Sequence, residues 1–462
     1  MKKSENILIL GLGSMGGYLA RRLTHEGHRV TVIENDAKVL AEADATLDAR
    51  LIRGDALDFG CWNQAEAAKM DYMIAATNDD AVNILAAQIA DRLGIRQKIS
   101  RIRSVELWRK DAPISAEDLK IDLVIRPDEL AAREVVRLLR MRDGNVVIDV
   151  GDGDLRVVAT PIGPDSPLAN LRLSRLSETF KDLPFRVMSV ARDIDTIIPG
   201  GDFEIQPGDR VHLIAQRQYI PKIMELAQVT TGRSDHVLIV GGGLIGTRIA
   251  QLLQSTNTVR LLEIDEARAE QLAHTLDKTE CLHGDGSDRE TLLQAGLLNM
   301  DTVILATGDN EANIMSSVLA KHLIQTRADD WHAEIGKTIT LVKKEDYIGI
   351  AAALGIDIAL NADVLAASAM IRYIRREYVL AVANLHGCDA EMVQLIANPG
   401  SPITKRPLHS IDGLAGKVQI GGVCRDGTWD IARGVTQINE GDRVECVCSI
   451  DGLAELQRLF YA

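Results

Sequence analysis

Short apolar runs alternate with amphipathic stretches along the first part of the chain. Runs of Val, Ile and Leu predict buried strands, and apolar residues at every third or fourth position predict helices. Buried strands that alternate with helices indicate a doubly wound parallel sheet. The last two strands and the last helix of the series are expected to complete this first sheet and its helical cover. The expected series is strand 6–10, helix 15–26, strand 29–34, helix 36–45, strand 50–53, helix 57–68, strand 71–76, helix 79–92, a strand near 98–102, strand 121–125 and a helix near 128–141.

The pattern changes between about residues 145 and 229. Polar and apolar positions alternate there, turn-forming sequences such as VGDGD and QPGD recur, and a helix is expected near 219–228. Such a segment is typical of a small α+β domain. The sequence TTGRSD at 230–235 is the expected linker to the rest of the chain.

The whole pattern then occurs a second time. MDYMIAATNDDAVNI from Met70 matches MDTVILATGDNEANI from Met300, and QPGDRVHLIA from Gln206 matches NEGDRVECVC from Asn439. Matches that keep their order indicate a tandem duplication. The predicted fold is α/β, with two Rossmann-like doubly wound sheets, each followed by a small α+β domain. The expected domains are 1–143 and 235–385 for the nucleotide-binding sheets and 144–229 and 386–462 for the small domains.

Each predicted sheet begins with a glycine-rich turn between a strand and a helix. The first glycine permits a tight turn, the second lets a pyrophosphate approach backbone N–H groups, and the third lets the helix pack on the strand. The N-terminus of the following helix favours a phosphate. The glycines are Gly11, Gly13 and Gly16 in the first half and Gly241, Gly243 and Gly246 in the second, with Leu12 and Gly242 inside the turns.

Polar residues at the ends of later strands extend each predicted site. Glu34 and Glu263 end the second strand about 20 residues after the glycines, where a carboxylate binds ribose hydroxyls. An acid there disfavours NADP but does not distinguish NAD from ATP or ADP. Asp55 and Asp285 follow the third strand, and Thr77, Asn78 and Thr307 follow the fourth. For these later positions, turns and helix caps explain the residues as well as ligand contact does.

Charge and composition limit the partners. A formal net charge of −14 argues against general nucleic-acid binding and against direct docking on an anionic lipid surface, and an aromatic content of 3% argues against binding by stacked bases. The chain shows no apolar run that would span a bilayer and no secretory signal, so we expect a cytoplasmic location without membrane insertion.

No catalytic or metal-binding residues are expected. His212, His236 and His283 lie in or beside the repeated motifs, but their repeat partners are Glu445, Asn6 and Arg53. The six cysteines are scattered, which suits a reducing compartment. Cys446 and Cys448 would lie on one face of a strand, where core packing is favoured over a metal or redox site.

Together these motifs resemble the TrkA family, the peripheral regulatory subunits of bacterial Trk potassium uptake systems. ILGLGSMGG, SRIRS at 100–104, VGGGLIG, GDGSDRETLLQAG and ATGDNEANIMSSVLAK carry the resemblance, which covers nearly the whole chain. It implies tandem RCK domains that sense NAD(H), ATP or ADP and regulate potassium transport without being an enzyme. It also implies a homo-oligomeric, tetrameric ring, held at the inner face of the membrane by an integral potassium channel or transporter subunit.

The resemblance also implies particular binding residues. They are Gly11, Gly13, Ser14, Met15, Glu34, Thr77, Asn78 and Arg101 in the first half, and Gly241, Gly243, Leu244, Ile245, Glu263 and Thr307 in the second. Arg101 has two interpretations, a phosphate ligand or a solvated arginine at a strand end. This chain departs from the family pattern at Glu34, where Asp is usual, and at Leu341, which aligns with Arg101 and leaves Lys343 as the nearest cation.

Two other functions are compatible with the sequence. One is an NAD-dependent oxidoreductase with an unrecognised substrate, and the other is an assembly scaffold whose glycine turns no longer bind nucleotide.

Overall fold

The computed structural model describes most of the chain. The expected linker TTGRSD, except for its last residue, and most of the loop TRADDWHAEIGK lie outside the described residues. The described residues are 4–104, 113–139, 146–192, 195–226, 235–327, 337–376, 381–385, 388, 390–411, 414, 416–449 and 452–461.

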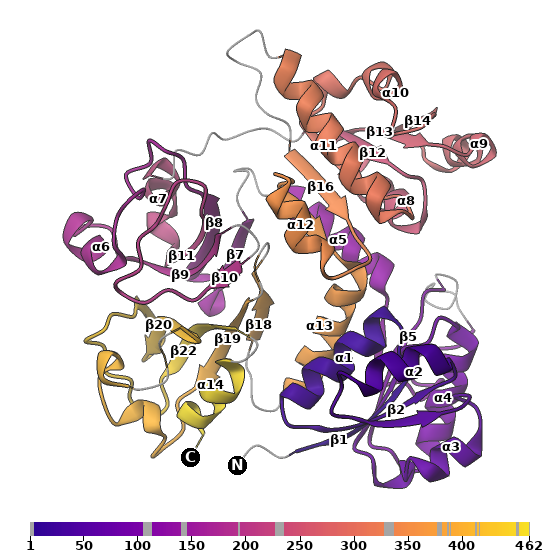
Figure 1. Ribbon diagram of the computed structural model, residues 1–462, viewed down its shortest axis with the longest axis horizontal. Helices are drawn as coiled ribbons and strands as arrows, with labels where there is room; N and C mark the ends of the chain where they lie inside the picture. The colour runs from indigo at the N-terminus through magenta and orange to yellow at the C-terminus, as the bar shows by residue number, and fades with distance from the viewer. Residues whose placement is uncertain are drawn as a thin grey trace. The chain divides into compact units, whose positions relative to one another are not determined.

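The first parallel sheet has six strands in the order β3-β2-β1-β4-β5-β6, with helices connecting them (Figure 1). Strand β1 pairs with β2 on one side and with β4 on the other, so the strand order reverses at β1. Ligands of such sheets bind at this reversal, beyond the carboxyl ends of the strands. The elements are β1 (Asn6–Leu10), α1 (Ser14–His25), β2 (Arg29–Glu34), α2 (Ala37–Asp44), β3 (Arg50–Arg53), α3 (Phe59–Gln64), β4 (Tyr72–Ala75), α4 (Asp80–Arg92), β5 (Gln97–Arg101), β6 (Leu123–Ile125) and α5 (Pro127–Leu139).

The second parallel sheet repeats this topology in the order β14-β13-β12-β15-β16-β17. The duplication that the sequence predicts is therefore present at the level of strand order, and the prediction of two doubly wound sheets is confirmed. The elements are β12 (His236–Val240), α8 (Leu244–Leu253), β13 (Thr258–Glu263), α9 (Glu266–Thr275), β14 (Thr279–His283), α10 (Arg289–Gln294), β15 (Thr302–Leu305), α11 (Asn310–Arg327), β16 (Lys337–Leu341), α12 (Tyr347–Ala353), β17 (Ile358–Leu360) and α13 (Ala362–Arg375).

Each small domain contains a five-stranded antiparallel sheet. The strand orders are β10-β9-β11-β8-β7 and β18-β19-β22-β20-β21, which are the same order when repeat partners are matched. The elements are β7 (Val146–Val150), β8 (Leu155–Pro161), α6 (Leu173–Thr179), β9 (Phe185–Arg192), β10 (Asp195–Ile197), β11 (Arg210–Gln216) and α7 (Ile220–Leu226), then β18 (Ala381–Asn384), β19 (Ala390–Ile396), β20 (Val418–Arg425), β21 (Thr428–Ile431), β22 (Arg443–Ser449) and α14 (Gly452–Phe460).

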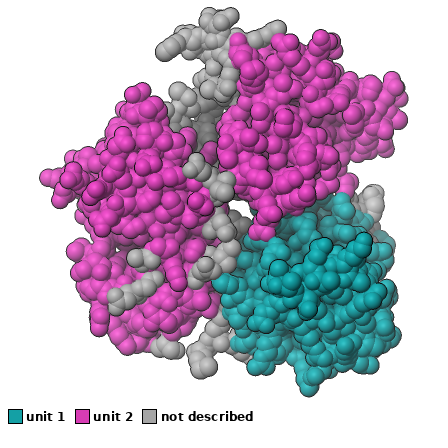
Figure 2. Space-filling model, in the orientation of Figure 1, with its two compact units in different colours: residues 1–131, 361–375 teal, residues 132–360, 376–462 magenta. Residues whose placement is uncertain are grey.

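The chain divides into two compact units that do not follow its two halves (Figure 2). Unit 1 contains residues 1–131 and 361–375, and unit 2 contains 132–360 and 376–462. Helix α13, which follows the last strand of the second sheet, therefore belongs with the first sheet. The greater part of α5, which follows the last strand of the first sheet, belongs to unit 2.

Side-chain packing explains this exchange of helices. Ala366, Met370 and Ile374 of α13 are buried in one cluster with Ile7 and Ile9 of β1. The other face of β1 is covered by residues of α3 and α4. The sequence predicted that the helix near 128–141 packs with the first sheet. This prediction is wrong for most of that helix, because its residues from Ala132 onward belong to unit 2.

The exchanged part of α5 packs on the second sheet. Its residues Val135 and Leu138 are buried in one cluster with Val237 and Ile239 of β12. Because duplicated sheets present similar apolar faces, the amphipathic pattern of a helix does not indicate which of the two sheets it covers.

No helix among the described residues is long and apolar enough to cross a membrane.

Candidate functional site

The first glycine turn lies between β1 and α1 and leaves space for a ligand. Gly11 has φ +91°, which favours glycine. A Cβ atom at Gly16 would lie 2.0 Å from the carbonyl oxygen of Gly11, so α1 packs too closely on the turn for any side chain there. A Cβ atom at Gly13, in contrast, would have no neighbour within 4 Å. The open space is therefore above the second glycine, where the fingerprint places a pyrophosphate.

The first turns of α1 and α8 contain the other predicted residues of the glycine motifs. Ser14 is exposed, whereas Met15 is 2% exposed and faces the core. Leu244, the counterpart of Ser14, is 53% exposed, and Ile245 is half-buried. Backbone N–H groups of this helix turn, and not the apolar side chains, are suited to phosphate binding.

Glu34 is held against the glycine turn by backbone donors. Its Oε2 atom accepts a hydrogen bond from the N–H of Leu12 at 2.6 Å, and its Oε1 atom accepts one from the N–H of Asp36 at 2.8 Å. Glu263 makes the same pair of bonds, with Gly242 at 2.6 Å and Asp265 at 3.0 Å. Each carboxylate is therefore fixed where an adenosine ribose is expected.

A buried asparagine organises the turn after β4. The Oδ1 atom of Asn83 accepts hydrogen bonds from the N–H and hydroxyl of Thr77, at 3.2 and 2.7 Å. Its amide nitrogen donates to the carbonyl oxygens of Thr77 and Arg101, at 3.1 and 2.8 Å. Asn83 thereby ties the ends of β4 and β5 together. The sequence signal was an Asn repeated at the same offset, but sequence reasoning gave it no role.

Asn313 does the same in the second half. It accepts from the N–H and hydroxyl of Thr307, at 3.0 and 2.6 Å, and donates to the carbonyl oxygen of Leu341 at 2.9 Å. The repeat thus preserves the hydrogen-bonded turn as well as the glycines.

Arg101 lies at the carboxyl end of β5 and points to the turn after β4. Its Nη1 atom donates to Oδ1 of Asn78 at 2.7 Å, so two predicted residues are brought together. Its Nη2 atom lies 3.9 Å from Oδ1 of Asp363, in the first turn of α13. The residue is 9% exposed, which excludes the interpretation of Arg101 as a solvated arginine.

Two cations lie at the second pocket: Lys343, which the sequence indicates as the nearest cation, and Arg268, which it does not indicate. The Nζ atom of Lys343 donates to the carbonyl oxygen of Gly308, the repeat counterpart of Asn78, at 2.5 Å. Alignment of the repeats puts Leu341 opposite Arg101, but Lys343, two residues further along the chain, places its charge at the same turn. Arg268 of α9 donates through Nε to the carbonyl oxygen of Gly242 at 3.2 Å. The repeat did not indicate Arg268, because the equivalent residue of the first half, five positions after Glu34, is the apolar Val39.

The aspartates after the third strands make turn hydrogen bonds. Oδ1 of Asp55 accepts from the N–H of Leu57 at 2.7 Å, and Oδ1 of Asp285 accepts from the N–H of Ser287 at 2.8 Å. These bonds account for both residues as turn formers. Ligand contact by either carboxylate remains a prediction.

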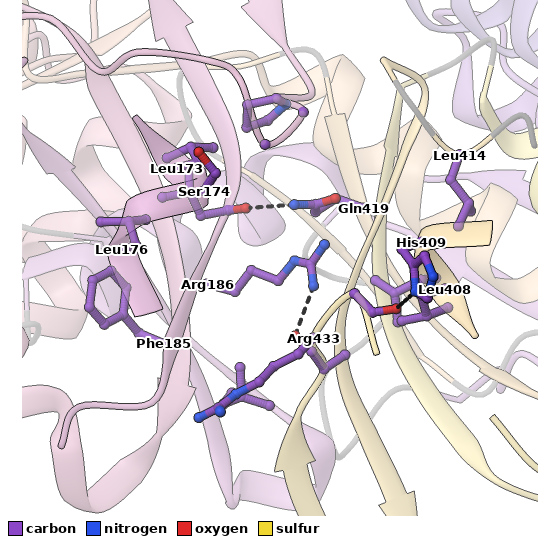
Figure 3. Close-up of a pocket in the computed structure, with 18 of the residues that line it drawn as sticks. Leu173, Ser174, Leu176, Phe185, Arg186, Leu408, His409, Leu414, Gln419 and Arg433 are labelled. Carbon is purple, nitrogen blue, oxygen red and sulfur yellow. Dashed lines mark hydrogen bonds between the residues drawn. The ribbon is translucent and has the colours of Figure 1, made fainter. Parts of the chain in front are cut away.

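A separate cavity of about 550 Å³ lies between the two small sheets, within unit 2 (Figure 3). Arg186 lines it and donates to the carbonyl oxygen of Ala432 at 2.8 Å, while Gln419 donates to the carbonyl oxygen of Val187 at 3.2 Å. Burial lowers the pKa of the Arg186 guanidinium to about 10. None of the predicted nucleotide-site residues lines this cavity.

Two cysteines and one histidine that could have formed a metal, redox or catalytic site are buried in the small domains. Cys446 and Cys448 are buried in one apolar cluster, as core packing predicts. His212 is 1% exposed, and its Nδ1 atom lies 3.1 Å from the Ser189 hydroxyl. Within the described parts of the chain, no three or more His, Cys, Asp and Glu side chains are grouped to hold a metal ion.

Comparison with known families matches both halves of the chain. The TrkA-N domain model matches residues 7–127 and 237–362, and the TrkA-C domain model matches residues 157–228. Two relatives are similar over nearly the full length. Trk system potassium uptake protein TrkA of Halomonas elongata is 30% identical and that of Azorhizobium caulinodans is 29% identical, each over 98% of both chains.

Solved structures support the fold. The crystal structure of the GsuK RCK domain is similar with a TM-score of 0.56 and 16% identity, over 99% of this chain and 94% of that chain. The GsuK channel bound to NAD is similar with a TM-score of 0.56 and 17% identity, over 99% of this chain and 78% of that chain. Both likenesses concern the arrangement of the backbone.

Proposed function

The chain belongs to the TrkA family, and from that premise we propose that it is a nucleotide-sensing regulatory subunit of a potassium uptake system. The observation that carries the proposal is the duplicated pocket. Each half places an open glycine turn, a fixed carboxylate and a cation at the carboxyl ends of neighbouring parallel strands.

The ligand class follows from this set of groups. Backbone N–H groups above Gly13 and Gly243 suit a pyrophosphate, and Glu34 and Glu263 suit unphosphorylated ribose hydroxyls. Arg101 and Lys343 add positive charge at the far end of each pocket. We propose NAD(H), ATP and ADP as the ligands. A solved relative in fold, the GsuK channel, is described as bound to NAD.

The remaining predicted contacts belong to this proposal. Ser14 and Met15 of the first turn, and Leu244 and Ile245 of the second, would contribute backbone N–H groups, whereas the N–H groups of Leu12 and Gly242 would hold the carboxylates of Glu34 and Glu263 beside the ligand. Gly11, Gly16, Gly241 and Gly246 would shape the turns, while Thr77, Asn78 and Thr307 would line the far end of each pocket.

Regulation requires a ligand that distinguishes two conformations. A nucleotide that binds both conformations with equal affinity does not shift the equilibrium between them, however tightly it binds. We propose that the protein assembles as a homo-oligomeric ring on the cytoplasmic side and acts on an integral membrane subunit of the Trk type. Occupancy of the pockets by nucleotide then favours one conformation of the ring, and this conformation changes the rate of potassium transport by the membrane subunit. No catalytic step is part of this proposal.

Calorimetric titration of the purified protein with NADH, NAD⁺, ATP and ADP tests nucleotide binding. Potassium uptake by cells that lack the protein then tests the regulatory role, with the wild-type chain compared with Gly13→Val and Gly243→Val. We expect the wild type to restore uptake and the variants to alter its response. Absence of binding to all four nucleotides at millimolar concentration would contradict the proposal, and reduction of NAD⁺ by the protein with a metabolite would favour an oxidoreductase.

A further inference from the structure

The first nucleotide pocket contains a charged residue from the other half of the chain. Asp363 lies in the first turn of α13, and α13 belongs to the same compact unit as the first sheet. Oδ1 of Asp363 is 3.9 Å from Nη2 of Arg101. The helix exchange thus places an acid beside a cation of the pocket.

Arg101 retains capacity to bind an anion. Its Nη1 atom is used by Asn78, but its Nε atom is buried and has no hydrogen-bond partner among the described residues. An unsatisfied buried donor on a charged group is unfavourable, so a small movement of the side chain that brings Nε to a phosphate or hydroxyl oxygen of a ligand would be favoured. Asp363 provides partial charge compensation, because 3.9 Å is too long for a hydrogen bond.

Strand order shows which part of a nucleotide would reach this pair. Adenosine is expected over β1 and β2, where Glu34 is fixed, and the pyrophosphate over the glycine turn. Arg101 is at the end of β5, on the far side of β4 from β1. The group beyond the pyrophosphate therefore lies nearest Arg101 and Asp363. In a dinucleotide this group is a ribose with nicotinamide, which carries no negative charge, whereas in ATP it is the third phosphate.

We propose that Asp363 sets the charge selectivity of the first pocket, so that a dinucleotide is favoured over a nucleoside triphosphate. The proposal rests on the nucleotide-sensing function above and specifies the ligand class of its first site. A carboxylate next to Arg101 weakens the attraction of the arginine for a third phosphate and repels that phosphate directly. A ribose hydroxyl, in contrast, finds both a donor in Arg101 and an acceptor in Asp363.

Among the described residues, Asp80 and Asp128 at the ends of neighbouring elements have other partners. The carboxylate of Asp80 accepts hydrogen bonds from the N–H groups of Arg103 and Ser104. Asp128, the repeat counterpart of Asp363, forms an ion pair with Arg103 at 3.2 Å. Asp128 thus provides a matched control, with the same residue type at the same position of the other crossover helix.

The experiment compares Asp363→Asn and Asp128→Asn in a background that carries Gly243→Asp. The background puts a carboxylate in the open space of the second turn, so that binding reports on the first pocket. NADH, ADP and ATP are titrated calorimetrically with a chelator present, because a divalent cation would mask the charges. We expect Asp363→Asn to raise affinity for ATP about tenfold relative to NADH, and Asp128→Asn to leave this ratio unchanged.

The outcomes separate this inference from the proposed function. If the Gly243→Asp parent binds no nucleotide, the proposed first site fails. If the parent binds but Asp363→Asn leaves the ratio of ATP to NADH affinity unchanged, or Asp128→Asn changes it equally, the role of Asp363 is refuted. Asp363→Ser keeps a residue that is suited to a helix start, and it should give the same shift if Asp363→Asn fails to fold.

Discussion

Arg375 and Glu26 form an ion pair in the interior of unit 1. The Nε atom of Arg375 donates to Oε2 of Glu26 at 3.1 Å, and the two side chains are 1% and 3% exposed. The pair joins the end of the exchanged helix α13 to the residue that follows α1. A charge pair so deeply buried is costly to break, because the remaining side chain stays in the interior without the opposite charge of its partner.

Removal of one partner should therefore destabilise unit 1. We expect Arg375→Met to cost about 3 kcal/mol in the free energy of unfolding, and Arg375→Met with Glu26→Leu to recover a large part of this loss. Denaturant titration of the full chain measures both. Lys69→Met, which removes the exposed pair with Glu66, is the control and should leave the unfolding midpoint unchanged. Equal effects of the single and double variants would refute the account.

The glycines of the first turn should respond differently to substitution. Gly16→Ala forces a Cβ atom against the carbonyl oxygen of Gly11 and should cost about 3 kcal/mol of stability. Gly13→Val has space and should fold normally, but it should weaken NADH binding at least about tenfold, since its side chain fills the space for the pyrophosphate. Thermal unfolding and titration of both proteins test this. Normal NADH binding by folded Gly13→Val would show that the pyrophosphate lies elsewhere.

Asn83 should matter for stability and for binding. Asn83→Ala leaves the Thr77 donors and the Arg101 carbonyl oxygen without their buried partner, at a cost of about 2 kcal/mol. Because the ends of β4 and β5 are then no longer joined, we also expect weaker nucleotide binding at the first site. Asn313→Ala is the matched variant and should affect the second site instead. If Asn83→Ala binds nucleotide as the wild type does, the asparagine serves the fold alone.

Lys343 should act as the counterpart of Arg101 in the second pocket. Lys343→Met, in a Gly13→Val background that blocks the first pocket, should weaken ATP binding about tenfold, because a positive charge is removed from the turn after β15. Lys344→Met is the control, since Lys344 lies over the ring of Tyr347. An equal loss in both variants would indicate a general electrostatic effect of the surface.

Glu445 should make the stability of unit 2 depend on pH. Burial raises the pKa of its carboxyl group, although Gly151 N–H and Gln394 donate to it. A raised pKa means that the folded state binds the proton more tightly than the unfolded state. The contribution to stability is therefore complete below the ordinary pKa of about 4.5 and is lost as pH rises through the folded pKa.

Glu445→Gln removes this dependence. We expect the variant to unfold at a higher temperature than the wild type at pH 8 and at a similar temperature at pH 5, because glutamine keeps an acceptor for Gly151 without a charge. Calorimetric scans at the two pH values measure the difference. A wild type that is more stable at pH 8 than at pH 5, with the variant unchanged, would contradict the assignment to Glu445.

The repeated sequence by itself determined the duplication, the doubly wound class of each sheet, the two glycine turns and the position of Glu34 and Glu263 at strand ends. These features depend on local rules: the period of apolar residues, the backbone freedom of glycine, and the position of an acid at a strand end. Such local features can therefore be predicted from the sequence alone, whereas ligand contact by these residues stays a prediction. The buried surroundings of Arg101 and its bond to Asn78 were not fixed by the sequence, because a strand-end arginine is equally compatible with solvent.

Only the tertiary structure decided which helix covers which sheet. An amphipathic helix has an apolar face, but the two duplicated sheets offer nearly equivalent partners for it, so sequence gave no preference between them. The exchange of α5 and α13 brought Asp363 to Arg101 and Arg375 to Glu26, across more than two hundred residues of chain. Contacts of this kind depend on packing between distant segments, and no local pattern encodes them.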